Sequence, residues 1–141
     1  MSEITSIDFK LIIPKGVGIQ KEVSFVKVPG TGGEVGILPN HTASLALLKS
    51  GELQINHDEE KEFYFVSEGT AHITETSVTV LTPHLEKVSD IDTNRAKESL
   101  KRAEERLTAK NQDGIDRGRA IASKTRAEVR LDMYKRHHIT A

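Results

Sequence analysis

Gly33-Glu34-Val35-Gly36-Ile37-Leu38-Pro39-Asn40-His41 is the stretch on which the interpretation of this chain depends, because turn residues in it enclose a short apolar run. Val35 to Leu38 can form a short strand, and Pro39 must end it, since proline has no backbone N–H for a sheet hydrogen bond. The neighbouring glycines can take a positive φ without steric cost: Gly30, Gly32, Gly33 and Gly36. Two interpretations stay open, a tight corner in a β domain or a loop displayed for a partner.

Alternating apolar residues on both sides of this stretch predict a β domain. Ile7, Phe9, Leu11 and Ile13 alternate with other residues, which is typical of a half-buried strand. Further short β-like runs, separated mostly by Gly, Asn, Asp or Ser, favour an antiparallel sandwich or barrel. These runs are residues 23–28, 35–38, 45–48, 53–55, 63–66, 71–74 and 78–81. We expect the β domain to occupy residues 1–86.

The apolar period changes after Ser89. Ala96, Leu100, Ala103 and Leu107 recur at helical spacing, and either Ser89 or Asp92 can cap the start of this helix. Residues 111–114, Asn-Gln-Asp-Gly, interrupt the pattern, and a second apolar stripe follows at Ala120, Ala127, Leu131 and Tyr134. The expected fold class is therefore α+β, an N-terminal antiparallel β-sandwich followed by a C-terminal antiparallel helical hairpin at residues 87–141. Its seam is mostly alanine and buries little area, so we expect the hairpin to open readily.

Composition and charge restrict the classes of function that this chain can have. The 141 residues include no Cys, which excludes disulfides and Cys-ligated zinc. Met1-Ser2-Glu3 lacks the start of a secretory signal, and no apolar run approaches ~20 residues, so we expect a cytoplasmic location. Residues 1–86 hold 6 Lys+Arg against 12 Asp+Glu (−6), and residues 87–141 hold 14 against 9 (+5). We expect the basic part to meet an anion or an acidic surface.

Arginines recur along both expected helices. Helical geometry puts Arg95, Arg102 and Arg106 in one row and Arg119, Arg126 and Arg130 in another, and an antiparallel pair brings both rows to one side. Like charges one turn apart repel unless something neutralises them. The pattern is compatible with a solvated basic face, or with a site for a polyphosphate or an acidic protein surface.

No group of residues predicts catalysis. The histidines show no metal-ligand spacing, and the chain has neither a phosphate-binding Gly-Lys-Ser/Thr loop nor a nucleophile elbow. We therefore predict a non-catalytic protein without a metal or a required cofactor. The alternative is a nucleic-acid-binding module that uses the basic hairpin. The acidic β domain and the lack of aromatic residues among the basic ones argue against it, and we expect no nucleic-acid partner.

The opening stretch, followed by Leu45 to Lys49 and Gly51, resembles the ε subunit of a bacterial-type F-type ATP synthase. Residues 78–81 are similar to the strand that ends the β domain of that family. Asp90-Ile91-Asp92-Thr93-Asn94-Arg95-Ala96 resembles its Ile-Asp-x-x-Arg-Ala motif, which begins the helical hairpin. The resemblance covers essentially the whole chain in the family's order, and it implies the same β-sandwich and hairpin.

The resemblance also implies a role. A central-stalk subunit of this kind couples proton or sodium translocation to ATP synthesis and inhibits ATP hydrolysis when its hairpin opens. The implied partners are the γ subunit, the c-subunit ring and the α and β subunits of the catalytic head. Membrane contact comes only through the complex, on the cytoplasmic face of the inner membrane. The resemblance implies partner contact by Glu34 and His41. It also implies regulatory ATP binding in the closed hairpin by Glu86, Ile91, Asp92, Arg95, Arg102, Arg126 and Arg130.

Overall fold

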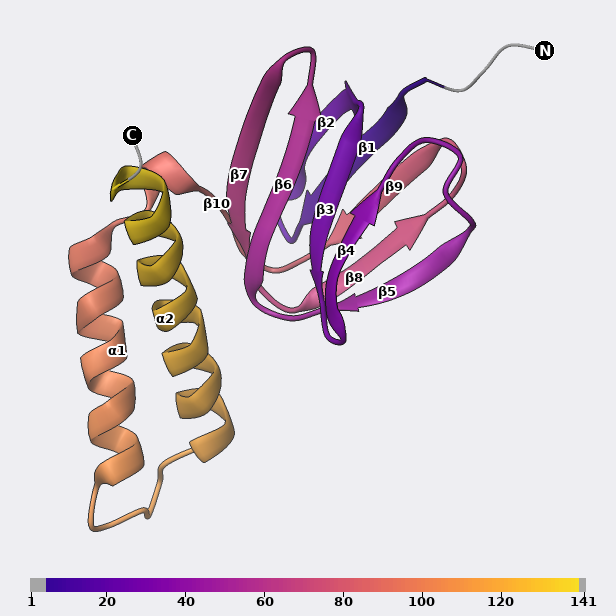
Figure 1. Ribbon diagram of the computed structural model, residues 1–141. Helices are drawn as coiled ribbons and strands as arrows, with labels where there is room; N and C mark the ends of the chain where they lie inside the picture. The colour runs from indigo at the N-terminus through magenta and orange to yellow at the C-terminus, as the bar shows by residue number, and fades with distance from the viewer. Residues whose placement is uncertain (1–4, 140–141) are drawn as a thin grey trace. The chain divides into compact units, whose positions relative to one another are not determined.

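The computed structural model describes residues 5–139, which form two compact units (Figure 1). The first unit ends at Lys87 and the second begins at Val88. The residues at which we looked for a secretory signal, Met1 to Glu3, lie outside the described range. Within that range, none of the helices combines the length and the apolar character that crossing a membrane requires.

The first unit consists of ten strands in one continuous sheet that folds back on itself. The strands are β1 (Ile7–Ile13), β2 (Gly16–Val23), β3 (Phe25–Gly30), β4 (Gly33–Ile37), β5 (Ser44–Leu48), β6 (Gly51–His57), β7 (Glu60–Val66), β8 (Gly69–Ile73), β9 (Ser77–Leu81) and β10 (Leu85–Lys87). Their order in the sheet is β10-β7-β6-β3-β5-β8-β9-β1-β2, and β4 pairs with β3. The expected fold class, a sandwich-like β domain followed by two helices, is confirmed.

One strand pair departs from the antiparallel pattern. β1 and β9 run parallel, with Phe9 beside Val78 and Leu11 beside Val80. All four of these side chains are buried, because they belong to the inward-facing set of their strands. The remaining ladders are antiparallel. The two strands lie far apart in the sequence, so no local pattern predicted their direction.

Two strands were not predicted, β2 and β10. In β2 the inward-facing series is Ile19, Lys21 and Val23, so a charged residue interrupts the apolar alternation. Lys21 is accommodated because its Nζ lies 2.9 Å from Oε2 of Glu62 in β7. β10 has only three residues, none of them fully buried, and it pairs only with the end of β7. A strand that short carries too little pattern to be recognised.

The opening stretch forms the β3–β4 hairpin and the loop after it. Of the four glycines expected to allow a positive φ, only Gly33 uses it, at 131°. Gly30 and Gly36 lie within β3 and β4, where the lack of a side chain lets neighbouring atoms approach closely. A Cβ on Gly30 would lie 2.7 Å from the carbonyl oxygen of Gly33. Asn40 takes a φ of 70°, and its N–H donates to the carbonyl of Glu75 at 2.9 Å. The stretch is therefore a tight corner, anchored to the β8–β9 turn.

The second unit contains a 3-10 helix, η1 (Val88–Asp90), and two helices, α1 (Thr93–Thr108) and α2 (Arg117–Ile139). Asp92 is the N-cap of α1, and Ser89 lies within η1, which decides between the two expected caps. The helices bury small side chains: Ala96, Ala103, Ala120 and Ala127 are at most 4% exposed. Leu131 and Tyr134, expected in the seam, are only half-buried, whereas Met133 is fully buried. The two helices therefore bury little side-chain area against each other, as the sequence predicted.

Candidate functional site

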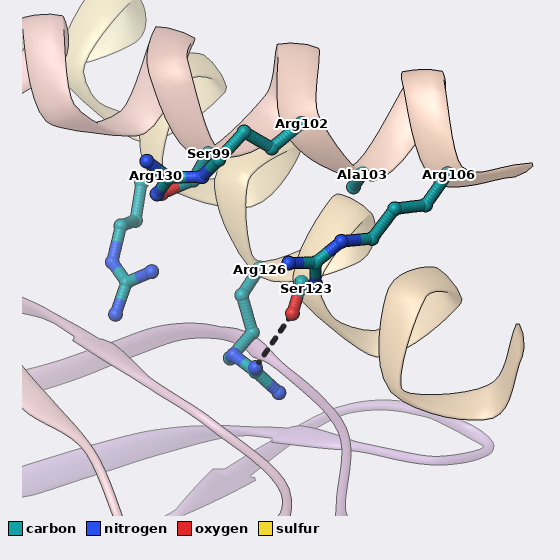
Figure 2. Close-up of a pocket in the computed structure, with 7 residues that line it drawn as sticks. All are labelled: Ser99, Arg102, Ala103, Arg106, Ser123, Arg126 and Arg130. Carbon is teal, nitrogen blue, oxygen red and sulfur yellow. Dashed lines mark hydrogen bonds between the residues drawn. The ribbon is translucent and has the colours of Figure 1, made fainter. Parts of the chain in front are cut away.

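An arginine-lined pocket of about 350 Å³ lies between α1 and α2 (Figure 2). Its lining consists of four arginines, two serines and an alanine: Arg102, Arg106, Arg126, Arg130, Ser99, Ser123 and Ala103. None of the described residues that line it is acidic. Guanidinium groups present several N–H donors in a fixed planar arrangement, which suits phosphate and carboxylate oxygens. The pocket can therefore bind an anion with several negative charges.

Hydrogen bonds within each helix orient two of the arginines. Nη2 of Arg102 donates to Oγ of Ser99 at 3.3 Å, and Nη2 of Arg126 donates to Oγ of Ser123 at 3.2 Å. Each bond spans three residues along one helix, the spacing at which helical side chains lie on the same face. Arg102 and Arg106 are exposed, whereas Arg126 and Arg130 are half-buried. The charged groups thus face a site that is open to solvent on one side.

The structure brings together three of the seven residues that the resemblance assigns to ATP binding, namely Arg102, Arg126 and Arg130. The other four do not line the pocket. Asp92 caps α1 by accepting a hydrogen bond from the Arg95 N–H at 3.0 Å, and Ile91 is buried next to this cap. Glu86 is half-buried in β10, within the first unit. Arg119, from the second predicted row, also lies outside the lining.

Sequence reasoning assigned three lining residues to no ligand site: Ser99, Ala103 and Ser123. Arg106 was placed in the arginine row but not in the ligand set. A signal that could have found all three was present in the sequence, because each helix carries the pattern Ser-x-x-Arg-Ala-Glu-x-Arg. The two copies are residues 99–106 and 123–130.

The expected partner-contact residues lie around the β3–β4 corner. Glu34 is largely exposed, with Oε2 3.5 Å from Nζ of Lys27. Nδ1 of His41 donates to the carbonyl of Thr42 at 2.7 Å, which holds the ring against its own loop. Three large apolar side chains in this part of the chain are exposed although they would be expected to be buried: Leu38, Leu45 and Leu47, at 61%, 58% and 60%. Exposed apolar side chains of this size are typical of a surface that a partner covers.

A second charged cluster lies on the β unit but does not resemble a catalytic or metal site. Glu62 binds Lys21, and Nε2 of His57 lies 3.4 Å from Oε2 of Glu62. Burial raises the pKa of Tyr64 above its usual value, and the neighbouring Glu62 raises it further. Residues 5–139 contain no group of three or more His, Asp or Glu side chains placed to hold a metal ion. This cluster joins strands β2, β6 and β7.

Comparison with known proteins assigns both units to one family. The β-sandwich domain of the ATP synthase delta/epsilon chain matches residues 6–88, and the long α-helix domain of the same chain matches residues 89–135. The ATP synthase epsilon chain of Nitratidesulfovibrio vulgaris is 35% identical over 126 residues, which is 89% of this chain and 93% of that protein. The epsilon chain of Bacillus cytotoxicus is 37% identical over 87% of this chain and 92% of its own length.

Solved structures share the fold. A chain in the mitochondrial ATP synthase of Euglena gracilis superposes with a TM-score of 0.72 at 20% identity, over 99% of this chain and 84% of that one. A chain from the central stalk and c-ring of the Tetrahymena thermophila mitochondrial ATP synthase gives 0.60 at 13% identity, over 94% and 99%. The chain therefore belongs to the ATP synthase delta/epsilon chain family, whose members are non-catalytic subunits of ATP synthase.

Proposed function

We propose that this chain is the central-stalk ε subunit of an F-type ATP synthase and that its helical hairpin senses ATP. The arginine pocket carries this proposal, because four arginines line it without an acidic residue among the described lining. Gathering like charges on neighbouring turns costs free energy unless an anion neutralises them. A triphosphate would supply negative charge to this pocket.

In the proposed mechanism ATP stabilises the closed hairpin. The helix contact is thin, since four alanines make up most of its buried side chains. A ligand that binds only the closed state stabilises it by RT ln(1 + [L]/Kd), which is about 2.7 kcal/mol when ATP exceeds Kd a hundredfold. A shift of that size is sufficient to reverse a weak opening equilibrium. The further residues that the resemblance implies, Glu86, Ile91, Asp92 and Arg95, belong to the same proposal.

The open hairpin would inhibit ATP hydrolysis. Between Arg117 and Arg136, α2 carries seven basic residues against Glu128 and Asp132, a net charge of +5. Such a helix is suited to acidic surface on the α and β subunits of the catalytic head. ATP binding would withdraw it, so inhibition would be strongest when ATP is scarce.

The β unit would attach the subunit to the rotor. Glu34 and His41, with the exposed leucines Leu38, Leu45 and Leu47, form the surface that we assign to the γ subunit and the c-subunit ring. The subunit would then couple proton or sodium translocation to ATP synthesis, on the cytoplasmic face of the inner membrane and in contact with the membrane only through the complex. Apart from ATP as a regulatory ligand, the proposal needs no cofactor.

Calorimetric titration of ATP into the full chain tests the sensor. We expect saturable binding by the wild type and binding at least about tenfold weaker by Arg126→Ala, since a hydrogen bond between charged groups contributes roughly 1.5–3 kcal/mol. The matched control is Arg119→Ala, which removes the same charge from α2 outside the pocket. Absence of binding by the wild type at millimolar ATP would refute the sensor.

Truncation tests the inhibition. A chain that stops after Lys87 keeps β10, which pairs with β7, and removes the whole second unit. We expect a catalytic head reconstituted with this truncated chain to hydrolyse ATP faster than one with the full chain, most clearly at low ATP. Equal rates for the two complexes would eliminate the inhibitory role and leave the structural one.

A further inference from the structure

The helical unit buries a methionine side chain completely. Within residues 88–139, the buried side chains are an isoleucine, four alanines and a methionine: Ile91, Ala96, Ala103, Ala120, Ala127 and Met133. Met133 is 0% exposed, and it is the one large side chain in this range that is completely buried. An alanine removes little apolar area from water, so Met133 supplies a large share of the area that the closed hairpin buries.

The surface residues around Met133 make contacts that lie within α2. Nε of Arg136 donates to Oδ2 of Asp132 at 2.8 Å, and the rings of Tyr134 and His138 stack with their centroids 3.7 Å apart. Both pairs are one helical turn apart, so they form equally well in a closed and in an open hairpin. In the closed hairpin α2 packs against α1 and η1 (Figure 1). Separation of α2 from them therefore leaves these pairs intact and exposes Met133.

We propose that Met133 is an oxidation site for hydrogen peroxide and that its sulfoxide holds the hairpin open. The inference rests on the proposed function in taking the hairpin to open. In the closed state burial keeps peroxide from the sulfur, so the reaction takes place in the open state. A lone pair of the thioether attacks one peroxide oxygen, the O–O bond breaks and an S–O bond forms. Sulfur is oxidised, and the second oxygen leaves with both protons as water.

Oxidation turns an apolar side chain into a polar one. The sulfoxide oxygen is a hydrogen-bond acceptor, and burying such a group without a donor is unfavourable. The other buried side chains in residues 88–139, Ile91 and the four alanines, have no donor to offer. In the open state water satisfies the sulfoxide. We therefore expect oxidation to shift the equilibrium between closed and open hairpin at least about tenfold toward the open form.

Timed treatment of the full chain with hydrogen peroxide, followed by peptide mass spectrometry, measures oxidation at Met133. The reference rate is that of the same chain unfolded in urea. An open state that is populated at about 0.1–10% predicts a native rate about ten to a thousand times lower, with the β unit still folded by hydrogen exchange. A native rate equal to the reference would show that the sulfur is not protected. Reaction only after the β unit unfolds would show that opening does not expose it. Either result overturns the inference.

Trypsin cleavage of α2 reports the opening, because a helix without its packing partner is only marginally stable. We expect oxidation to speed cleavage of the wild type at least about tenfold, and methionine sulfoxide reductases A and B to reverse the effect. Met133→Leu keeps the size and removes the sulfur, so its cleavage should not respond to peroxide. Met133→Gln, with a buried polar group, should be cleaved fast without peroxide. An unchanged cleavage rate in fully oxidised wild type, or an equal response of Met133→Leu, would overturn the inference.

Reconstitution with the catalytic head separates this inference from the proposed function. We expect a head with the oxidised full chain to hydrolyse ATP more slowly than one with the reduced chain, even at millimolar ATP. If trypsin reports opening and hydrolysis is unchanged, the oxidation site stands and the inhibitory role fails. If the reduced chain inhibits and oxidation does not open the hairpin, the inhibitory role stands and the oxidation site fails as a switch.

Discussion

Nζ of Lys21 lies 2.9 Å from Oε2 of Glu62, and this ion pair joins β2, at one end of the strand order, to β7, next to the other end. The Lys21 and Glu62 side chains are 32% and 17% exposed. Burial by itself raises the pKa of Glu62, but the hydrogen bond and the charge of Lys21 oppose it, and the net pKa lies below the usual 4.5. The folded chain therefore favours the ionised carboxylate.

Removing this carboxylate should lower the free energy of unfolding only at pH values at which the carboxylate is ionised. Because the folded pKa of Glu62 is depressed, its contribution is present above the unfolded pKa and is lost as pH falls through the folded pKa. We expect Glu62→Gln to lower the free energy of unfolding of the β unit by about 1 kcal/mol at pH 7. The difference should shrink below about pH 4.5. Urea unfolding across this pH range measures it.

Glu59→Gln is the control for that experiment, because Glu59 is exposed and forms no ion pair among the described residues. We expect it to stay within about 0.5 kcal/mol of the wild type at every pH. A Glu62→Gln effect that does not change between pH 7 and pH 3 would show that packing, and not charge, sets its size.

Tyr64 should titrate at a higher pH than an unburied tyrosine. Burial raises its pKa above 10.0, and the charge of Glu62 and a hydrogen bond to Glu62 raise it further. The chain has two tyrosines, so Tyr134→Phe leaves Tyr64 as the only ionising phenol in an absorbance titration. Adding Glu62→Gln should then lower the pKa of Tyr64. The stability that neutral Tyr64 contributes is present below the unfolded pKa and is lost as pH rises through the folded one.

Gly30 and Gly32 lie two residues apart in the β3–β4 hairpin but should respond differently to alanine. A Cβ on Gly30 would lie 2.7 Å from the Gly33 carbonyl oxygen and 3.2 Å from Cγ2 of Val35, whereas one on Gly32 meets nothing within 4 Å. We expect Gly30→Ala to destabilise the β unit by roughly 1–3 kcal/mol. Gly32→Ala should be neutral or slightly stabilising, because alanine restricts the unfolded chain. Thermal unfolding compares the two, and equal melting temperatures would contradict the packing argument.

The caps of the two helices should be equivalent. Asp92 and Asp116 accept the same hydrogen bond, at 3.0 and 3.1 Å. We expect Asp92→Ala and Asp116→Ala each to destabilise the helical unit by about 1 kcal/mol, and Asp→Asn at either position to retain most of the cap. Circular dichroism at 222 nm during heating follows the helices. A cost at one cap and none at the other would show that the two helix starts are not equivalent.

Leu47 should matter for assembly more than for folding. Its side chain is 60% exposed on β5, on the same face as Leu45. We expect Leu47→Ser to change the stability of the isolated chain by less than about 0.5 kcal/mol. Binding to the γ subunit should weaken about tenfold, since full burial of a leucine contributes roughly 1.5–3 kcal/mol.

Val17→Ser is the matched control for assembly, because Val17 is 56% exposed on β2, outside the proposed contact surface. Surface plasmon resonance with an immobilised γ subunit compares the two variants. If Val17→Ser weakens binding as much as Leu47→Ser, the contact surface has been assigned to the wrong part of the β unit.

Local pattern accounted for much of this structure. Alternation at Ile7, Phe9 and Leu11 predicted β1 with its observed bounds, and the helical spacing of Ala96 and Ala103 predicted α1. It failed at β2, where an inward-facing lysine breaks the alternation, and at Met133, which takes the buried place expected for its neighbours. In the site, the arginine rows predicted that charges would gather, but not that Arg106 lies inside the pocket while Arg95 lies outside it.

The sequence alone was sufficient to predict the two-part organisation and the buried faces of most elements, and it contains the repeated motif of the helices. These properties depend on residue spacing within a few turns or strands. Tertiary packing decided the parallel pairing of β1 with β9 and the junction of β2 with β7 through Lys21 and Glu62. It also decided which arginines share one pocket. Each of these depends on residues distant in sequence whose partners are selected by the shape and charge of the whole unit, and no local period encodes that choice.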